Sequence, residues 1–120
     1  MCIRDSSRAQ QLGVEYVLDT EVAHGDINAM DNQLRQRLTE YTDVHLTIDL
    51  DALPGEKAPG VSAPAAFGIA LEKVEKLVAT IVASGKLTAA DIAECNPAYD
   101  RDSLTAKVAA RLAHLILQPV

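Results

Sequence analysis

Two spacings of apolar residues recur along the chain, and each predicts one kind of element. Apolar residues three or four positions apart predict helices, and these cover residues 27–41, 68–83 and 103–117. Short runs of apolar and β-branched residues predict strands, and these cover residues 14–18, 44–50 and 87–95. Residues 7–12 have the character of a helix end, and the segments between the elements include two predicted loops, at 19–26 and 52–67. Asp26 is expected to cap the helix at 27–41, and Asp100 or Asp102 the helix at 103–117.

The order of these elements predicts the fold class. Strand and helix alternate, which is typical of βαβ units with a parallel sheet. Apolar residues make up 48% of the chain but aromatic residues only 3%, so Ala, Val, Leu and Ile must form the core. Such a composition suits a sheet that is covered by helices on both faces. We therefore expect a three-layer α/β/α arrangement, truncated at its N-terminal side and carrying an unpaired sheet edge.

Charge and composition exclude several classes of partner. The net charge of −6 without a basic patch argues against a nucleic-acid-binding protein. No apolar run reaches the roughly 18 residues that a membrane span needs, and no signal peptide is visible. The two cysteines form neither a metal-binding nor a disulfide pattern, so a cytoplasmic location is expected.

Three carboxylates are expected at the carboxyl ends of two neighbouring strands. Asp49 and Asp51 end the strand at 44–50, and strand alternation would place both side chains on one face. Glu94 ends the next strand, and ligands bind beyond this edge of an open parallel sheet. Two carboxylates on one face call for a cation, and oxygen ligands suit Mg²⁺ or Mn²⁺. Asp-x-Asp after a strand also occurs in nucleotide-sugar transferases and in phosphatases with an aspartate nucleophile.

Two longer motifs narrow these alternatives. Asp49-Leu50-Asp51-Ala52-Leu53 is followed by Ala58-Pro59-Gly60 and Pro64, and Glu94-Cys95-Asn96-Pro97 comes later. In this order the two blocks resemble signatures of the ureohydrolase family, which includes arginase, agmatinase and formimidoylglutamase. Thr47 replaces the family's usual Ser, and Pro54-Gly55 stands where most members have Asp-Pro.

The loop between the blocks is most similar to that of formimidoylglutamase, because arginases and agmatinases usually carry Gly-Thr-Gly-Thr or a close variant in place of residues 60–63. The resemblance implies a manganese-dependent hydrolase of small molecules that converts N-formimidoyl-L-glutamate to L-glutamate and formamide. The alternatives are another ureohydrolase, which releases urea from a guanidino substrate, and a non-catalytic α/β module.

The resemblance also implies roles for the three carboxylates. Asp49 would be a ligand of both Mn²⁺ ions, Asp51 a ligand of one, and Glu94 would bind the cationic nitrogen end of the substrate. The family's His-x-Gly-Gly-Asp-His and Asp-Ala-His-x-Asp blocks, which supply further metal ligands, do not occur in the 120 residues. We therefore expect residues 7–120 to be the C-terminal part of one ureohydrolase-like domain, inactive alone. Because the family commonly assembles into oligomers, the resemblance also implies a homo-oligomer, although the sequence itself carries no interface signal.

Four further expectations concern single residues or short segments. Residues 1–6 are interpreted as a non-native leader. His45 is expected to be packed or hydrogen-bonded and not a ligand or base, and Thr47 to support the two aspartates. Cys95, next to Glu94, is expected to point to the opposite face and to pack there.

Overall fold

Two parallel strands form the centre of the fold. In the computed structural model, which describes residues 3–118, β1 (Val44–Asp49) pairs with β2 (Leu87–Ala93), and Thr47 lies opposite Asp91. Both strands and their parallel pairing were predicted. β1 ends one residue and β2 two residues earlier than expected. The carboxyl ends of both strands therefore meet at one edge of the sheet, which is where the predicted site residues follow.

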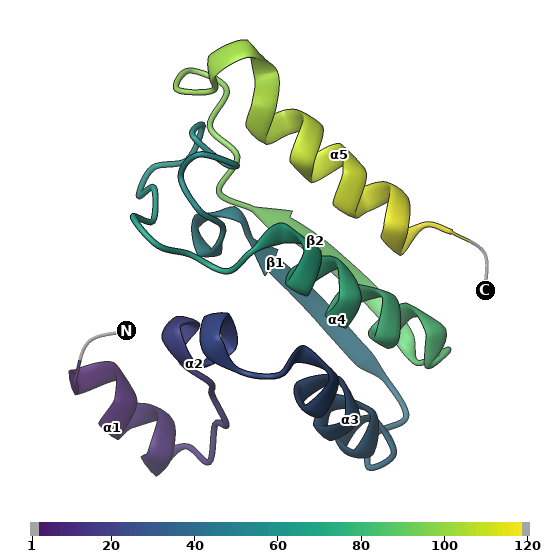
Figure 1. The fold of residues 1–120 in the computed structure, drawn as a ribbon. Helices are drawn as coiled ribbons and strands as arrows, with labels where there is room; N and C mark the ends of the chain where they lie inside the picture. The colour runs from purple at the N-terminus through teal and green to yellow at the C-terminus, as the bar shows by residue number, and fades with distance from the viewer. Residues whose placement is uncertain (1–2, 119–120) are drawn as a thin grey trace.

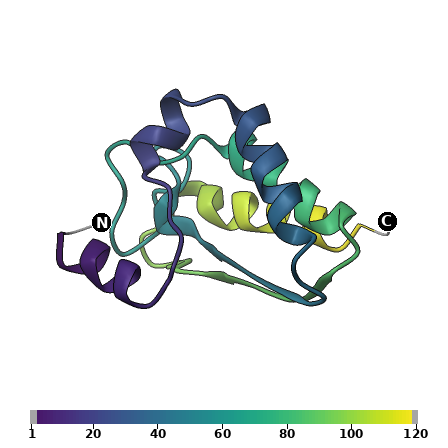
Figure 2. The same ribbon diagram turned by 90° about the horizontal axis from the view of Figure 1, so that it is seen from below.

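Five helices accompany the strands in the described part of the chain. They are α1 (Ile3–Gln11), α2 (Asp19–His24), α3 (Ile27–Leu38), α4 (Leu71–Ala83) and α5 (Leu104–Ile116). Short 3-10 turns, η1 (Leu50–Ala52) and η2 (Arg101–Ser103), follow β1 and precede α5. The helices α4 and α5 pack on one side of the sheet, and α3 lies beside α4 (Figures 1 and 2). None of the helices in residues 3–118 is long and apolar enough to cross a membrane.

The helices α4 and α5 cover one face of the sheet. Along β1, Leu46 and Ile48 face the helices, whereas His45 and Thr47 are exposed on the other face. Within residues 3–118 the structure thus holds the sheet and one of the two helical layers that were predicted.

The N-terminal third differs most from the predictions. Residues 14–18 form neither a strand nor a helix, and the only pairing between named strands in residues 3–118 joins β1 to β2. Residues 19–26, predicted as a loop, contain α2, whose first turn is closed by a hydrogen bond from the Leu18 N–H to the Glu21 carboxylate at 2.8 Å. Helix α1 begins at Ile3, inside the segment interpreted as a leader, while Met1 and Cys2 lie outside the described residues.

Residues 12–18 expose a row of apolar side chains. Leu12, Val14 and Val17 are 68%, 53% and 56% exposed, and a row of this kind favours contact with another molecule. We expect the 120-residue chain to self-associate as its concentration rises, and V17K to weaken that association because it places a charge in the row. Sedimentation velocity measures the effect, with Q33K on the exposed face of α3 as the charge-matched control. A monodisperse wild-type chain at all concentrations would contradict this expectation.

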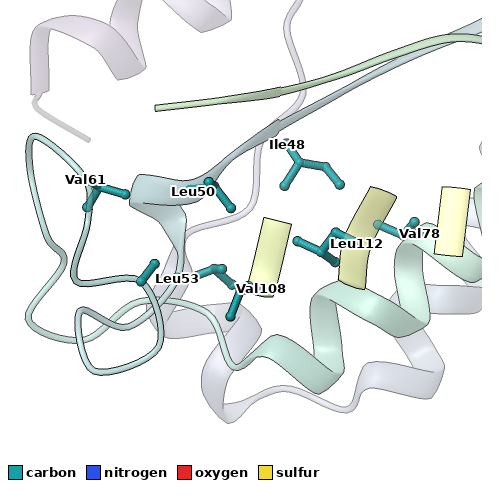
Figure 3. Close-up of a cluster of buried hydrophobic side chains, with 8 residues drawn as sticks. Ile48, Leu50, Leu53, Val61, Val78, Val108 and Leu112 are labelled. Carbon is teal, nitrogen blue, oxygen red and sulfur yellow. The ribbon is translucent and has the colours of Figure 1, made fainter. Parts of the chain in front are cut away.

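The long loop at 52–67 is anchored in the core. Leu53, Ala58 and Val61 from this loop are almost fully buried and belong to the same apolar cluster as residues of β1, η1, α4 and α5. The other members of this cluster, shown in Figure 3, are Ile48, Leu50, Val78, Val108 and Leu112. The loop also closes on itself, since the Gly55 N–H donates to the Ala65 carbonyl at 2.9 Å. Buried apolar anchors of this kind hold a surface loop in one place.

A buried aspartate links α3 to α4. Asp31 accepts hydrogen bonds from the Thr80 hydroxyl and from Arg35 Nε, the latter at 3.1 Å. The hydrogen bond from Thr80 lowers the pKa of the Asp31 carboxyl; burial acts in the opposite direction, and the hydrogen bond and charge of Arg35 lower the pKa again. The net pKa lies below its ordinary value, so the ionised form stabilises the fold.

The substitution D31N tests how much the ionised Asp31 stabilises the contact between α3 and α4. Because the folded-state pKa is lowered, the stabilisation by Asp31 is complete above the unfolded-state pKa of about 3.9 and is lost as the pH falls through the folded-state value. We expect D31N to lower the free energy of unfolding at pH 7, and its difference from wild type to shrink toward pH 3. Urea unfolding across this pH range measures the effect, with D43N, at an exposed aspartate, as the control. A difference that is independent of pH would contradict it.

Candidate functional site

Asp49 and Asp51 lie at the carboxyl end of β1, but on different elements. Asp49 is the last strand residue and is exposed, whereas Asp51 lies in the 3-10 turn η1 and is half-buried. The Asp49 Oδ1 accepts a hydrogen bond from the Asp51 N–H at 2.9 Å and so caps the turn. The prediction that strand alternation aligns the two side chains was wrong, because the strand ends at Asp49. The turn brings the carboxylates together instead.

The Asp51 carboxyl lies in an unfavourable electrostatic environment. Burial raises the pKa of its carboxyl first, and the nearby charges of Asp49 and Glu94 raise it further. A hydrogen bond from the Ala63 N–H works in the other direction. The Asp51 Oδ1 is buried and has no hydrogen-bond partner within the described residues. A buried, unpartnered carboxylate oxygen beside two like charges is costly unless a cation joins it.

Glu94 follows β2 directly and has an unusual backbone. Its φ of 70° is rare outside glycine and costs about 1–3 kcal/mol. The left-handed conformation breaks the alternation of β2, so the neighbouring Cys95 is exposed, and the prediction that it packs was wrong. The Glu94 Oε2 accepts a hydrogen bond from the Ser62 hydroxyl at 3.2 Å.

The two motif blocks are docked onto each other around Gly60. The Gly60 N–H donates to the buried Thr105 hydroxyl, and its carbonyl accepts from the Asn96 N–H, both at 2.7 Å. A Cβ at position 60 would lie 2.3 Å from the Asp100 Cβ and 2.5 Å from its Cα. Only glycine allows this approach, so the spacing between the Ala-Pro-Gly block and the Glu-Cys-Asn-Pro block depends on it.

Asp100 also stabilises the packing of the loop at Gly60 against the start of α5. Its carboxylate accepts hydrogen bonds from the N–H groups of Thr105 and Ala106 at 2.8 and 2.9 Å, as the predicted helix cap should. Burial acts to raise the pKa of Asp100, but these bonds, together with the Thr105 hydroxyl and the charge of Lys107, outweigh it and leave the pKa lowered. The carboxylate therefore stays ionised at neutral pH and holds the first turn of α5 against the loop.

A second polar cluster lies on the open face of the sheet. The Asp91 Oδ1 contacts His45 Nε2 at 2.7 Å and accepts from the Thr47 hydroxyl at 3.0 Å. The expectation that His45 is hydrogen-bonded is therefore confirmed. The hydroxyl of Thr47, predicted to support the two aspartates, instead binds Asp91 of the neighbouring strand. Sequence reasoning did not single out Asp91, which becomes visible only through the register of β1 and β2.

The carboxylates at the rim fit a divalent cation, although they do not complete a site for one. Asp49 and Asp51 are hard oxygen ligands of the kind that Mg²⁺ and Mn²⁺ prefer, and the unpartnered Oδ1 of Asp51 is available for a cation. Within the described part of the chain, no group of three or more His, Cys, Asp or Glu side chains is placed to hold a metal ion. Further ligands would have to come from outside residues 3–118.

Comparison with known proteins assigns the chain to a family. The sequence model of the arginase family matches residues 2–118, a span that contains both motif blocks. The chain belongs to the arginase family. This arginase-family chain is 50% identical over 111 residues to a formimidoylglutamase of Paraburkholderia xenovorans and 51% identical over 111 residues to one of Cupriavidus pinatubonensis. The matches cover 92% of the chain but 34% and 35% of those two proteins. The chain thus spans about a third of the length of the curated relatives it matches.

A solved structure shows the same fold. Arginase from Bacillus caldovelox superposes with a TM-score of 0.87 at 25% identity, over 97% of this chain and 39% of that one. The predicted fold class, a parallel α/β domain of the arginase type, is therefore confirmed. The predicted family is confirmed as well.

Proposed function

We propose that the protein containing this chain hydrolyses the C–N bond of N-formimidoyl-L-glutamate to give L-glutamate and formamide. The similarity of about 50% to two formimidoylglutamases, over a segment that includes Asp49, Asp51 and Glu94, is the observation that supports this substrate. In the overall reaction, the oxygen of water becomes the carbonyl oxygen of formamide, and the bond from the formimidoyl carbon to the glutamate nitrogen breaks. With a cationic formimidoyl group, both protons of water end on that nitrogen, which leaves as the ammonium group of L-glutamate. A cytoplasmic location and a homo-oligomer remain predictions.

In this proposal two of the carboxylates bind metal and the third binds substrate. Asp49 and Asp51 would be ligands of two Mn²⁺ ions, which supply Lewis-acid activation of water when bound. The buried, unpartnered oxygen of Asp51 supports this role, because a cation would neutralise it. Glu94 would accept hydrogen bonds from the cationic formimidoyl nitrogens, and its fixed backbone supports a binding role for its carboxylate.

The products distinguish the proposal from its rivals. The full-length protein, loaded with Mn²⁺, is incubated with N-formimidoyl-L-glutamate, agmatine and L-arginine, and formamide and urea are quantified. Formamide from the first substrate alone supports the proposal, and urea from either of the others replaces it with a different ureohydrolase activity. We expect the isolated 120-residue chain to be inactive, because the sequence holds neither histidine-bearing block. Turnover of N-formimidoyl-L-glutamate by the isolated chain would contradict that expectation.

A further inference from the structure

Ser62 and Glu94 meet at the rim of the sheet, although 32 positions separate them in the sequence. The Ser62 hydroxyl donates to the Glu94 Oε2 at 3.2 Å. Within residues 3–118, neither side chain makes another hydrogen bond. The contact therefore joins a residue of the loop at 52–67 to the carboxylate that follows β2, and each is the other's partner.

Both residues are held by rigid backbone. Val61, the neighbour of Ser62, is 2% exposed in the core, so the backbone that carries Ser62 is anchored. Glu94 has a left-handed φ, and two residues later the Asn96 N–H binds the Gly60 carbonyl. What remains free is the Glu94 side chain itself, which has several rotatable bonds. Among the described residues, the hydrogen bond from Ser62, between two exposed side chains, is the one that reaches the Glu94 carboxylate.

We propose that Ser62 is a positioning residue, whose hydroxyl holds the Glu94 carboxylate in the orientation that accepts the N–H groups of a cationic amidine. This inference rests on the proposed function of Glu94. A carboxylate offers about four lone-pair positions, and Ser62 occupies one of them on Oε2. The Oε1 and the remaining position on Oε2 stay available for the N–H groups of a formimidoyl substrate.

The neighbour of Ser62 allows positioning to be separated from a merely structural role. The Ala63 N–H acts to lower the pKa of the Asp51 carboxyl, so a displaced loop would disturb Asp51 together with Glu94. A positioning role predicts weaker substrate binding with unchanged metal content. A structural role predicts loss of Mn²⁺ and a lower kcat as well.

The test compares S62A, S62T and wild type in the full-length protein, with S84A, at the far end of α4, as the matched control. For S62A we expect KM to rise about tenfold and kcat to stay within about twofold, because the lost contact acts through ground-state binding. S62T keeps the hydroxyl and should stay within about threefold of wild type in KM, and S84A should match wild type. Unchanged KM in S62A, or a fall in kcat together with the Mn²⁺ content, overturns the proposal.

Two further measurements are made. The first tests whether Ser62 acts through Glu94, and the second tests binding without turnover of the assigned substrate. In an E94Q background, S62A should change KM by less than about twofold, because both substitutions then act on one contact. Binding of formamidinium ion, followed by saturation-transfer NMR, reports on the same carboxylate without turnover, and S62A should weaken it by a similar factor. If wild type does not hydrolyse N-formimidoyl-L-glutamate, the proposed function fails, whereas formamidinium binding that is equal in wild type and S62A refutes the role of Ser62.

Discussion

Replacing Asp51 by asparagine is expected to abolish Mn²⁺-dependent hydrolysis by the full-length protein, with kcat/KM at least about a thousandfold lower, because Lewis-acid activation contributes several kcal/mol. Asparagine keeps the shape of the side chain but removes the charge that would hold the cation. We expect the Mn²⁺ content, measured by atomic absorption, to fall in parallel. The control is D43N, at the opposite end of β1, which should retain both activity and metal.

In the isolated chain, which is tested without metal, the same substitution is expected to increase stability. Without metal, Asp51 places a buried and unpartnered oxygen beside the charges of Asp49 and Glu94. Removing that charge relieves the repulsion, so D51N should raise the denaturant midpoint of the 120-residue chain at pH 7. A variant that is unchanged in stability as a chain and fully active as an enzyme would show that Asp51 is an ordinary surface acid.

The second large effect is expected from G60A. The added Cβ would lie within 2.3–2.7 Å of three Asp100 atoms, one of which is the backbone Cα. Either the loop or the start of α5 must move, and the hydrogen bonds of Gly60 to Thr105 and Asn96 would weaken with it. We expect the free energy of unfolding to fall by about 3 kcal/mol, near the upper end of the usual cost of overpacking.

Chemical denaturation of the 120-residue chain measures this loss, and G55A provides the matched control. A Cβ at position 55 would meet Ala65 O and Pro64 Cβ at 3.2 Å, which is tight but leaves room for a small shift. In the full-length protein, G60A should also lower kcat/KM, because Gly60 sets the distance between the loop and the segment after β2. Equal stability of G60A and G55A would mean that the two blocks are not docked as described.

The sequence predicted the parts of the fold in which local pattern and tertiary packing agree. Helices α4 and α5 carry broad apolar stripes, and these stripes are what pack on the sheet. Residues 14–18 have the composition of a strand, yet a strand also needs a partner, and composition says nothing about whether one is within reach. The helix at 19–24 was missed because the polar run Asp-Thr-Glu was interpreted as a loop, although acidic residues also favour the first turn of a helix.

For the site, residue types were easier to predict than their geometry. The charges of Asp49 and Glu94 act on the Asp51 carboxyl, but Asp51 lies in a 3-10 turn and Glu94 has a positive φ, and periodicity cannot reveal either feature. The contact of Ser62 with Glu94 could not be predicted, since it spans 32 positions. The capping position of Asp100 was predictable because its partners, Thr105 and Ala106, are close in sequence.

The parallel pairing of β1 with β2 also governs the order in which the chain assembles. Thr47 and Asp91 are 44 positions apart, so their strands can join only after the intervening loop and α4 have been brought round. Closing so long a segment costs chain entropy before the contacts between the two strands can compensate for it. Parallel sheets therefore form late. We expect helix formation to precede strand pairing in stopped-flow refolding. The rim with Asp51 and Glu94 would then be the last part of the chain to become ordered.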